Sequence, residues 1–296
     1  MNLARTLKRQ GWRPEDALVG ALLLAAGVLA QRAAWADIVT IALLDEESSH
    51  IFLVLPVALW LAWLRRSRLR ACRARGRWIG PAVVAAGFVL GAVGFQLSMQ
   101  ALWHAGAVVV AVGCLLSVLG RDVLVQFLPS FAVLAFLVPV PGMIRQAYSI
   151  PLQGAAARLT HFSVELFGVL AERSGNVVII NDMPVAVAEA CNGVRMAFAL
   201  VLVTYAFAFS VPLRNYIRVL ILALSPAAAI LCNVIRLVPT VLLYGKAPLA
   251  WADAFHDISG WLMLPIAFFG LMAVERALRW ALVPTVRFSM ASREPA

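Results

Sequence analysis

Apolar stretches of about 20 residues, separated by short charged segments, fill most of the chain. A bilayer core takes roughly 20 helical residues per crossing, and a helix satisfies its own backbone hydrogen bonds where there is no water. Cutting the sequence at its charges and turn residues leaves eight such stretches. They lie near residues 17–35, 50–64, 78–97, 101–119, 123–140, 193–212, 217–238 and 258–275. The sequence therefore predicts an all-α polytopic membrane protein, a single domain over residues 1–296 with about eight transmembrane helices.

The composition agrees with this class and excludes several others. Hydrophobic residues make up 62% of the chain and charged residues only 14%, which is too apolar for an ordinary soluble domain. The net charge of +10 lies in short clusters between apolar runs, whereas a nucleic-acid surface needs a basic stripe or groove. Four cysteines without a CxxC spacing or a neighbouring histidine predict neither a metal site nor a redox pair. We expect no nucleic-acid partner and no cofactor.

Arginine clusters set the expected orientation, because Lys and Arg are retained in cytoplasmic loops. The loop after the second stretch is the strongest such signal and holds Arg65, Arg66, Arg68, Arg70, Arg73, Arg75 and Arg77. With eight spans, both termini then lie in the cytoplasm, as tails of residues 1–16 and 276–296. Ten acidic residues gather on the opposite side: Asp37, Asp45, Glu46, Glu47, Glu165, Glu172, Asp182, Glu189, Asp253 and Asp257. The first stretch lacks a signal-peptide cleavage site and is expected to remain as an anchor.

The longest connection, residues 141–192, faces the outer side in this topology and is too long for a plain linker. Residues 147–170 place apolar side chains at helical spacing with polar ones between them, the pattern of an interfacial amphipathic helix. Residues 176–180 and 184–188 flank a turn and predict a short β-hairpin. This hairpin leads the chain to Cys191.

Cys191 stands at the expected outer, amino-terminal end of the sixth stretch, in the segment Glu189-Ala190-Cys191-Asn192-Gly193-Val194-Arg195. A helix amino terminus stabilises a thiolate through its dipole and its free N–H groups, and Arg195 would share the same helical face. These features nominate Cys191 as a nucleophile. A bystander cysteine at the membrane interface is the alternative.

Arg236 lies in the seventh stretch, with Asn233 about one turn before it and no acidic residue within a turn. A guanidinium at membrane depth is costly and needs a cavity, a partner or an escape to the headgroups. Two interpretations stay open at this point. Arg236 has a functional role, or its side chain simply snorkels to the interface because the stretch is expected to end at Pro239.

His256, followed by Asp257, stands where the eighth stretch enters from the outer side. Its imidazole can titrate near neutrality, although taken alone it is also explained as an ordinary interfacial histidine. A catalytic role is favoured because three stretches each bring one residue, with a thiol, an imidazole or a guanidinium, to the same membrane face. In acyl transfer, Cys191 would attack a carbonyl, His256 would act as acid and base, and Arg236 would stabilise the oxyanion. The other histidines lack a cysteine or arginine partner of comparable placement: His50, His104 and His161.

These segments resemble the exosortase and archaeosortase family. The matching pieces are residues 188–195 around Cys191, 233–237 around Arg236, and His256-Asp257 followed by Gly260. Ser49-His50 leading to Pro56 and Arg65-Arg66 also resembles the early region of the family. Asn192 stands where family members commonly carry serine, a difference that we assign to the subfamily or to a local hydrogen bond.

The resemblance implies a cysteine-dependent protease and transpeptidase of the cell inner membrane. Cys191 would be the nucleophile, His256 the general acid and base, and Arg236 the oxyanion-stabilising residue. The supporting residues would be Glu189, Asn192, Gly193, Arg195, Asn233 and Asp257. Its partners would be exported proteins held in the membrane by a PEP-CTERM-type tail, which combines a short motif, a transmembrane helix and a basic cluster. Cleavage would be followed by transfer to a lipid or glycan acceptor.

Two other classes stay open on the sequence. A polytopic transporter would also suit many spans and an intramembrane arginine, but it predicts inverted repeats or matching broken helices, and no clear repeat is found. A non-catalytic component of an exopolysaccharide or envelope assembly system would tolerate the loss of Cys191.

Overall fold

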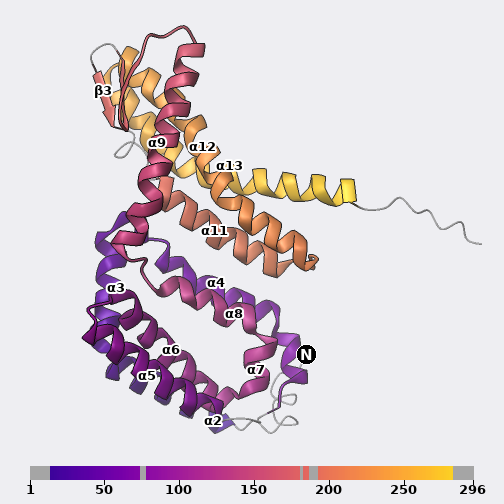
Figure 1. Ribbon diagram of the computed structural model, residues 1–296. Coiled ribbons are helices and arrows are strands. Elements are labelled where there is room, and N and C mark those ends of the chain that lie inside the picture. Colours follow the sequence, from indigo (N-terminus) through magenta and orange to yellow (C-terminus); the bar gives the residue numbers. More distant parts are fainter. Residues whose placement is uncertain (1–13, 74–77, 181–182, 187–192, 283–296) are drawn as a thin grey trace, which may run out of the picture.

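The computed structural model describes residues 14–73, 78–180, 183–186 and 193–282, which form a bundle of helices and one small sheet (Figure 1). Helices fill the predicted apolar stretches. Those that correspond to seven of the eight stretches are α2 (Pro14–Ala30), α4 (Ile51–Leu64), α5 (Ile79–Gln96), α6 (Gln100–Leu119), α11 (Gly193–Ser210), α12 (Asn215–Lys246) and α13 (Leu249–Leu282). The all-helical membrane architecture is thus confirmed in outline.

The remaining stretch, near residues 123–140, is broken into short pieces rather than one helix. These are α7 (Arg121–Gln126), α8 (Leu128–Ala132) and the 3-10 helix η3 (Val133–Leu137). Pro139 and Pro141 follow η3, and each proline removes a backbone donor and forces the residue before it into extended geometry. The chain therefore turns by 92° between residues 128–137 and the next helix, α9 (Gly142–Leu166).

Within the described residues, three helices are long and apolar enough to cross a membrane alone: α5, α6 and α12. The number rises to five if each of two bent pairs counts as one span. One pair is α2 with α3 (Arg32–Leu44), bent by 80°, and the other is residues 128–137 with α9. The predicted number of eight spans is therefore not established by helix length and composition.

α12 corrects one predicted boundary. The seventh stretch was expected to end near Pro239, but the helix continues through this proline to Lys246. The reason is tertiary packing: Val234, Leu237 and Val241 lie in one buried cluster with residues of α9 and the sheet. Packing of an apolar face outweighs the local cost of a missing donor.

The sheet has three antiparallel strands in the order β1-β2-β3, namely β1 (Glu172–Ser174), β2 (Val177–Ile180) and β3 (Met183–Ala186). The pair β2–β3, with Ile180 opposite Met183, is the hairpin that the sequence predicts; β1 was not predicted. α9 begins five residues before the predicted interfacial helix and ends four residues before its end. The sheet, α9 and the second half of α12 share one core, which includes Ala157, Val178 and Leu237.

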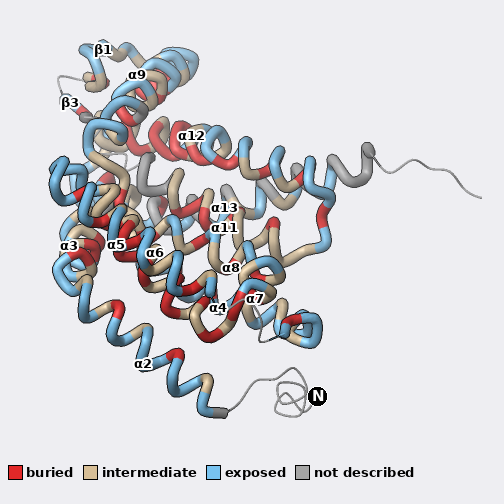
Figure 2. Tube along the Cα trace, turned by 60° about the horizontal axis from the view of Figure 1, so that its bottom comes forward, coloured by how far each residue is buried: buried red, intermediate tan, exposed pale blue. Residues whose placement is uncertain are grey.

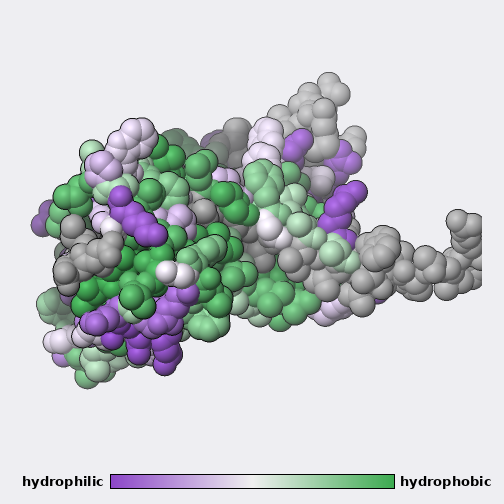
Figure 3. All heavy atoms as spheres, turned by 90° about the horizontal axis from the view of Figure 1, so that it is seen from above, coloured by the Kyte–Doolittle hydropathy of each residue, from purple (hydrophilic) through white to green (hydrophobic). Residues whose placement is uncertain are grey.

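Much of the surface is apolar, with hydrophilic side chains gathered in a few patches (Figure 3). Large side chains such as Leu59, Trp60 and Val89 are mostly exposed, while buried residues line the inner faces of the helices (Figure 2). A surface of this kind suits lipid rather than water as the solvent.

Two arginines and two acidic residues lie near opposite ends of α4. Arg65, after the last residue of α4, donates from Nη2 to the carbonyl of Phe209 at 2.8 Å, and Arg218 donates from Nε to the carbonyl of Ala208 at 3.0 Å. Both contacts lie at the carboxyl end of α11. The opposite end of α4 begins beside the acidic residues Asp45 and Glu47. The structure therefore separates these basic and acidic residues as the predicted topology requires.

α5 and α6 pack unusually closely. The buried residues of α5 are four glycines, Gly80, Gly87, Gly91 and Gly94. A Cβ atom added at Gly106 of α6 would lie 2.5 Å from the Cα of Gly91. Small residues let helix backbones approach each other in membranes, where dispersion contacts rather than the hydrophobic effect hold helices together.

Gly106→Ala should therefore force α5 and α6 apart and cost about 1–3 kcal/mol of folding free energy. Thermal unfolding of the purified protein in detergent measures this loss. Gly270→Ala is the matched control, because a Cβ at this helical position meets nothing within 4 Å. Equal melting temperatures for the two variants would contradict the close packing.

Candidate functional site

Cys191 and its neighbours Glu189 and Asn192 lie outside the described residues. The chain leaves the described part after Ala186 at the end of β3 and returns at Gly193, the first residue of α11. Gly193 and Arg195 belong to the first turn of α11 by their backbone, and their side chains are not described. The nucleophile and these supporting residues therefore stay predictions.

Arg236 is buried, with 7% of its surface exposed. It lies 21 residues into α12, about 32 Å along the helix at 1.5 Å per residue, which is close to the roughly 30 Å thickness of a bilayer core. Asn233, one turn earlier, is also buried, and Thr240 donates its hydroxyl to the carbonyl of Arg236 at 2.8 Å. A snorkelling side chain would be exposed at its tip, so burial inside the protein speaks against that interpretation.

His256 lies about two turns into α13, and 29% of its side chain is exposed. Its Nδ1 lies 3.1 Å from Oδ1 of Asp257, and the hydroxyl of Ser259 donates to its backbone carbonyl. An Nδ1–H that donates to this carboxylate leaves Nε2 as the basic nitrogen of the neutral ring. The Asp257 side chain therefore orients the imidazole.

The α12–α13 hairpin brings Arg236 and His256 to similar depths. α12 and α13 pack along each other, and the hydroxyl of Tyr244 donates to Oδ1 of Asp253 at 2.6 Å across their junction. Arg236 lies ten residues before the end of α12, and His256 lies seven residues after the start of α13. The difference of three residues corresponds to about 5 Å along the helices.

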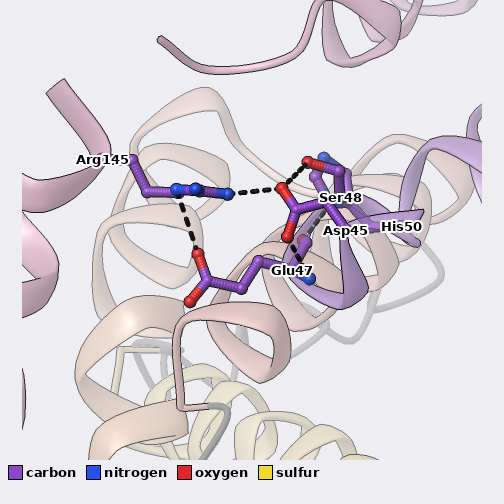
Figure 4. Close-up of polar contacts among 5 residues, drawn as sticks. All are labelled: Asp45, Glu47, Ser48, His50 and Arg145. Atoms are coloured by element: carbon purple, nitrogen blue, oxygen red, sulfur yellow. Dashed lines mark hydrogen bonds and ion pairs between the residues drawn. The ribbon is translucent and has the colours of Figure 1, made fainter. Parts of the chain in front are cut away.

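A polar cluster joins residues 45–50, here called the η1 corner because they contain the 3-10 helix η1 (Glu46–Ser48), to the start of α9 (Figure 4). Arg145 donates from Nη1 to Oδ2 of Asp45, and its Nε lies 3.3 Å from Oε2 of Glu47. Ser48 also donates to Asp45, at 2.9 Å. Nδ1 of His50 lies 3.0 Å from the carbonyl of Glu47. Because a carbonyl can only accept, this nitrogen carries the proton.

Sequence reasoning missed this cluster. Arg145 lies 100 residues from Asp45 along the chain, so no local pattern joins them. The one available signal was the sign of the charge, because Arg145 falls on the side where acidic residues gather. The ring of His50 also stacks on Phe198 of α11, with centroids 5.0 Å apart and planes within 12°.

Burial disfavours the charged forms of two titratable groups in this cluster, Glu47 and His50. Desolvation lowers the pKa of His50, partly opposed by the hydrogen bond to the Glu47 carbonyl and the charge of Asp45. Desolvation also raises the pKa of Glu47, and the charge of Arg145 opposes that rise. Both residues lie in the loop before α4, and His50 is held as the neutral ring near pH 7.

The remaining cysteines and acidic groups offer no second site. Cys72 and Cys114 are buried and Cys232 is partly buried. Among the residues that the structure describes, no group of three His, Cys, Asp or Glu side chains is placed to hold a metal ion. His104 is fully buried and bonds Asp37 of α3 at 2.8 Å, a polar contact between helices.

The fold and these residues define a class: a helical membrane protein with a buried arginine and a carboxylate-oriented histidine on neighbouring helices. The family model for the transmembrane exosortase (Exosortase_EpsH) matches residues 35–273, well over half of the chain. The chain therefore belongs to the transmembrane exosortase family, whose members are membrane proteases and transpeptidases acting on exported proteins with sorting signals. The search of curated proteins and the search of solved structures found no match.

Acidification should weaken the fold through His50. Its folded pKa lies below the ordinary value of 6.5, so its contribution is complete above that value. As the pH falls through 6.5, the unfolded chain binds a proton that the folded chain resists, and stability drops by at most about 1.4 kcal/mol per pH unit. His50→Gln should reduce the difference in melting temperature between about pH 7.5 and about pH 5.5. An unchanged difference would show that other groups dominate.

Proposed function

We propose that this exosortase is a cysteine-dependent transpeptidase, with Cys191 as nucleophile, His256 as acid and base, and Arg236 as the oxyanion-stabilising residue. The observation that carries the proposal is the burial of Arg236 at nearly the depth of His256 on the α12–α13 hairpin. An arginine kept out of water at membrane depth is costly, and such residues are retained for function.

The chemistry follows from the three side chains. The Cys191 thiolate attacks the scissile carbonyl, and Arg236 stabilises the negative oxygen of the tetrahedral intermediate. His256 then gives a proton to the leaving amine, the C–N bond breaks, and a thioester remains on Cys191. An acceptor nucleophile gives its proton to His256 and attacks the thioester, which restores the thiolate and leaves the substrate joined to the acceptor.

The supporting residues would act through these three. Asp257 orients the His256 ring, and Asn233 lies on the face of α12 next to Arg236. Arg195 would stabilise the thiolate at the start of α11, together with the N–H groups near Gly193. Glu189 and Asn192 would fix the backbone beside Cys191.

The substrates that we propose are exported proteins with a PEP-CTERM-type tail: a short motif, a transmembrane helix and a basic cluster. Cleavage would occur at the outer face, where the substrate chain leaves the bilayer. A membrane lipid or an envelope glycan would accept the product.

We further propose eight spans in the inner membrane, with both termini in the cytoplasm. The separation of Arg65 and Arg218 from Asp45 and Glu47 supports this orientation, because Arg is retained on the cytoplasmic side. α9 would then lie along the outer surface, since it is bent by 92° from residues 128–137.

Reporter fusions test this topology. Fusions after residue 73 and after residue 282 should be active only with a cytoplasmic reporter, and a fusion at Gly168 only with a periplasmic one. Gly168 is exposed and lies between α9 and the sheet, so an insertion there disturbs little. A cytoplasmic signal at Gly168 would overturn the orientation.

The catalytic assignment predicts how three variants behave with a tagged membrane protein that carries a candidate sorting tail. Removal of the tail should be lost in Cys191→Ala and fall by roughly a hundredfold or more in Arg236→Ala and His256→Ala at equal membrane levels. A gel shift of the tagged substrate measures it, and Arg158→Gln, an exposed arginine of α9, is the control. Undiminished cleavage by Cys191→Ala would remove the nucleophile and favour the scaffold or transporter class.

A further inference from the structure

The polar cluster of Figure 4 lies where two segments that flank Cys191 are anchored. One segment, here the upstream arm, runs from α9 through the sheet to Ala186. The other, the downstream arm, is α11. Arg145 belongs to the first turn of the upstream arm, and Phe198 belongs to the downstream arm. The η1 corner lies between α3 and α4 and contacts both arms: Glu47 pairs with Arg145, and His50 stacks on Phe198.

Arg145 contacts this corner through two nitrogens of its guanidinium. Nη1 donates to Asp45, and Nε lies 3.3 Å from Glu47, so the planar fork engages two carboxylates at once. All three side chains are partly buried, with 31%, 29% and 24% exposed for Arg145, Asp45 and Glu47. Ion pairs in such surroundings are less screened than surface pairs and hold their geometry better.

The corner in turn contacts α11 through His50. The Glu47 carbonyl fixes one edge of the imidazole, and the flat face of the ring lies on Phe198. His50 has only 6% of its surface exposed, so the surrounding residues hold its ring in place against Phe198. Phe198 follows Arg195 by three residues and therefore shares its helical face.

We propose that Arg145 is a positioning residue for Cys191: by holding the η1 corner, it sets the start of the upstream arm against the first turns of the downstream arm. This inference rests on the function proposed for Cys191. A displacement of either arm would move the thiol relative to Arg236, which is buried on α12, the helix whose Val234 and Leu237 share a core with the upstream arm. Small displacements of a reacting group cost rate rather than binding.

The test measures both turnover and the reactivity of the thiol. Cys72→Ala, Cys114→Ala and Cys232→Ala together leave Cys191 as the single cysteine, and its alkylation by N-ethylmaleimide is followed by mass in the purified full-length protein. Arg145→Gln should lower kcat for tail cleavage by roughly tenfold or more with KM within about twofold, and slow the alkylation of Cys191 by roughly threefold or more. Arg158→Gln on the same helix should leave both rates unchanged.

Two further variants protect the test against misfolding. Arg145→Lys keeps the charge but loses the fork, so intermediate losses in kcat and alkylation are expected. The losses from Asp45→Asn and Arg145→Gln should be less than additive when the two are combined, because the residues share one contact. If Arg145→Gln does not accumulate, these comparisons are made with Arg145→Lys.

The results separate the two proposals. A lower melting temperature for Arg145→Gln, with kcat and alkylation of the folded protein unchanged, would show that Arg145 only stabilises the fold and would overturn its positioning role. Cleavage that survives Cys191→Ala would instead overturn the proposed function. In that case the alkylation rates still report whether Arg145 positions the segment around Cys191.

Discussion

Burial of Arg236 is the constraint that the structure around α12 has to meet. Moving a charged side chain out of water costs several kcal/mol even after the protein relaxes, so the surrounding framework must be rigid enough to keep it there. On one face of α12, this framework includes the core that the second half of the helix shares with α9, β2 and β3. A Cβ at Gly245 would lie 2.5 Å from a side-chain atom of Ile180, which shows how tightly α12 meets the sheet.

This core explains why α12 is longer than a bilayer requires. Its 32 residues extend about 48 Å, against roughly 30 Å for the hydrocarbon core. The helix is thus long enough to cross a bilayer with its first part, while its second part packs against α9 and the sheet. Arg236 falls near the change from one part to the other. A helix that ended at Pro239 would remove Thr240 and Val241 from the packing that surrounds this arginine.

The sequence was sufficient for what depends on local patterns. Apolar runs identified the helices, and strand-like segments identified β2 and β3, because hydrophobic length and alternation are properties of contiguous residues. The break at residues 121–137 and the bend between α2 and α3 were missed. A continuous apolar run does not indicate where the axis of a helix changes direction. The prolines after η3 were visible, but a proline alone does not decide between a kink and an end, as Pro239 shows.

Parts of the site that depend on distant contacts could not be predicted. The choice between a buried and a snorkelling Arg236 depends on the helices that pack on α12, which are α9, α11 and α13. Arg145 could be recognised only by its sign, because its carboxylate partners belong to a corner 100 residues away. The stack of His50 on Phe198 likewise joins residues that no periodicity relates.

His50 and His256 differ in their exposure and in the groups that they contact. His50 has 6% of its surface exposed, is bonded to a backbone carbonyl and is stacked on an aromatic ring, so protonation would place a charge in a dry contact. The His256 side chain is 29% exposed, and its Nδ1 lies 3.1 Å from Oδ1 of Asp257. Proton transfer requires a ring that the reacting groups can reach. His256 meets this condition, whereas His50 is suited to hold the η1 corner in place.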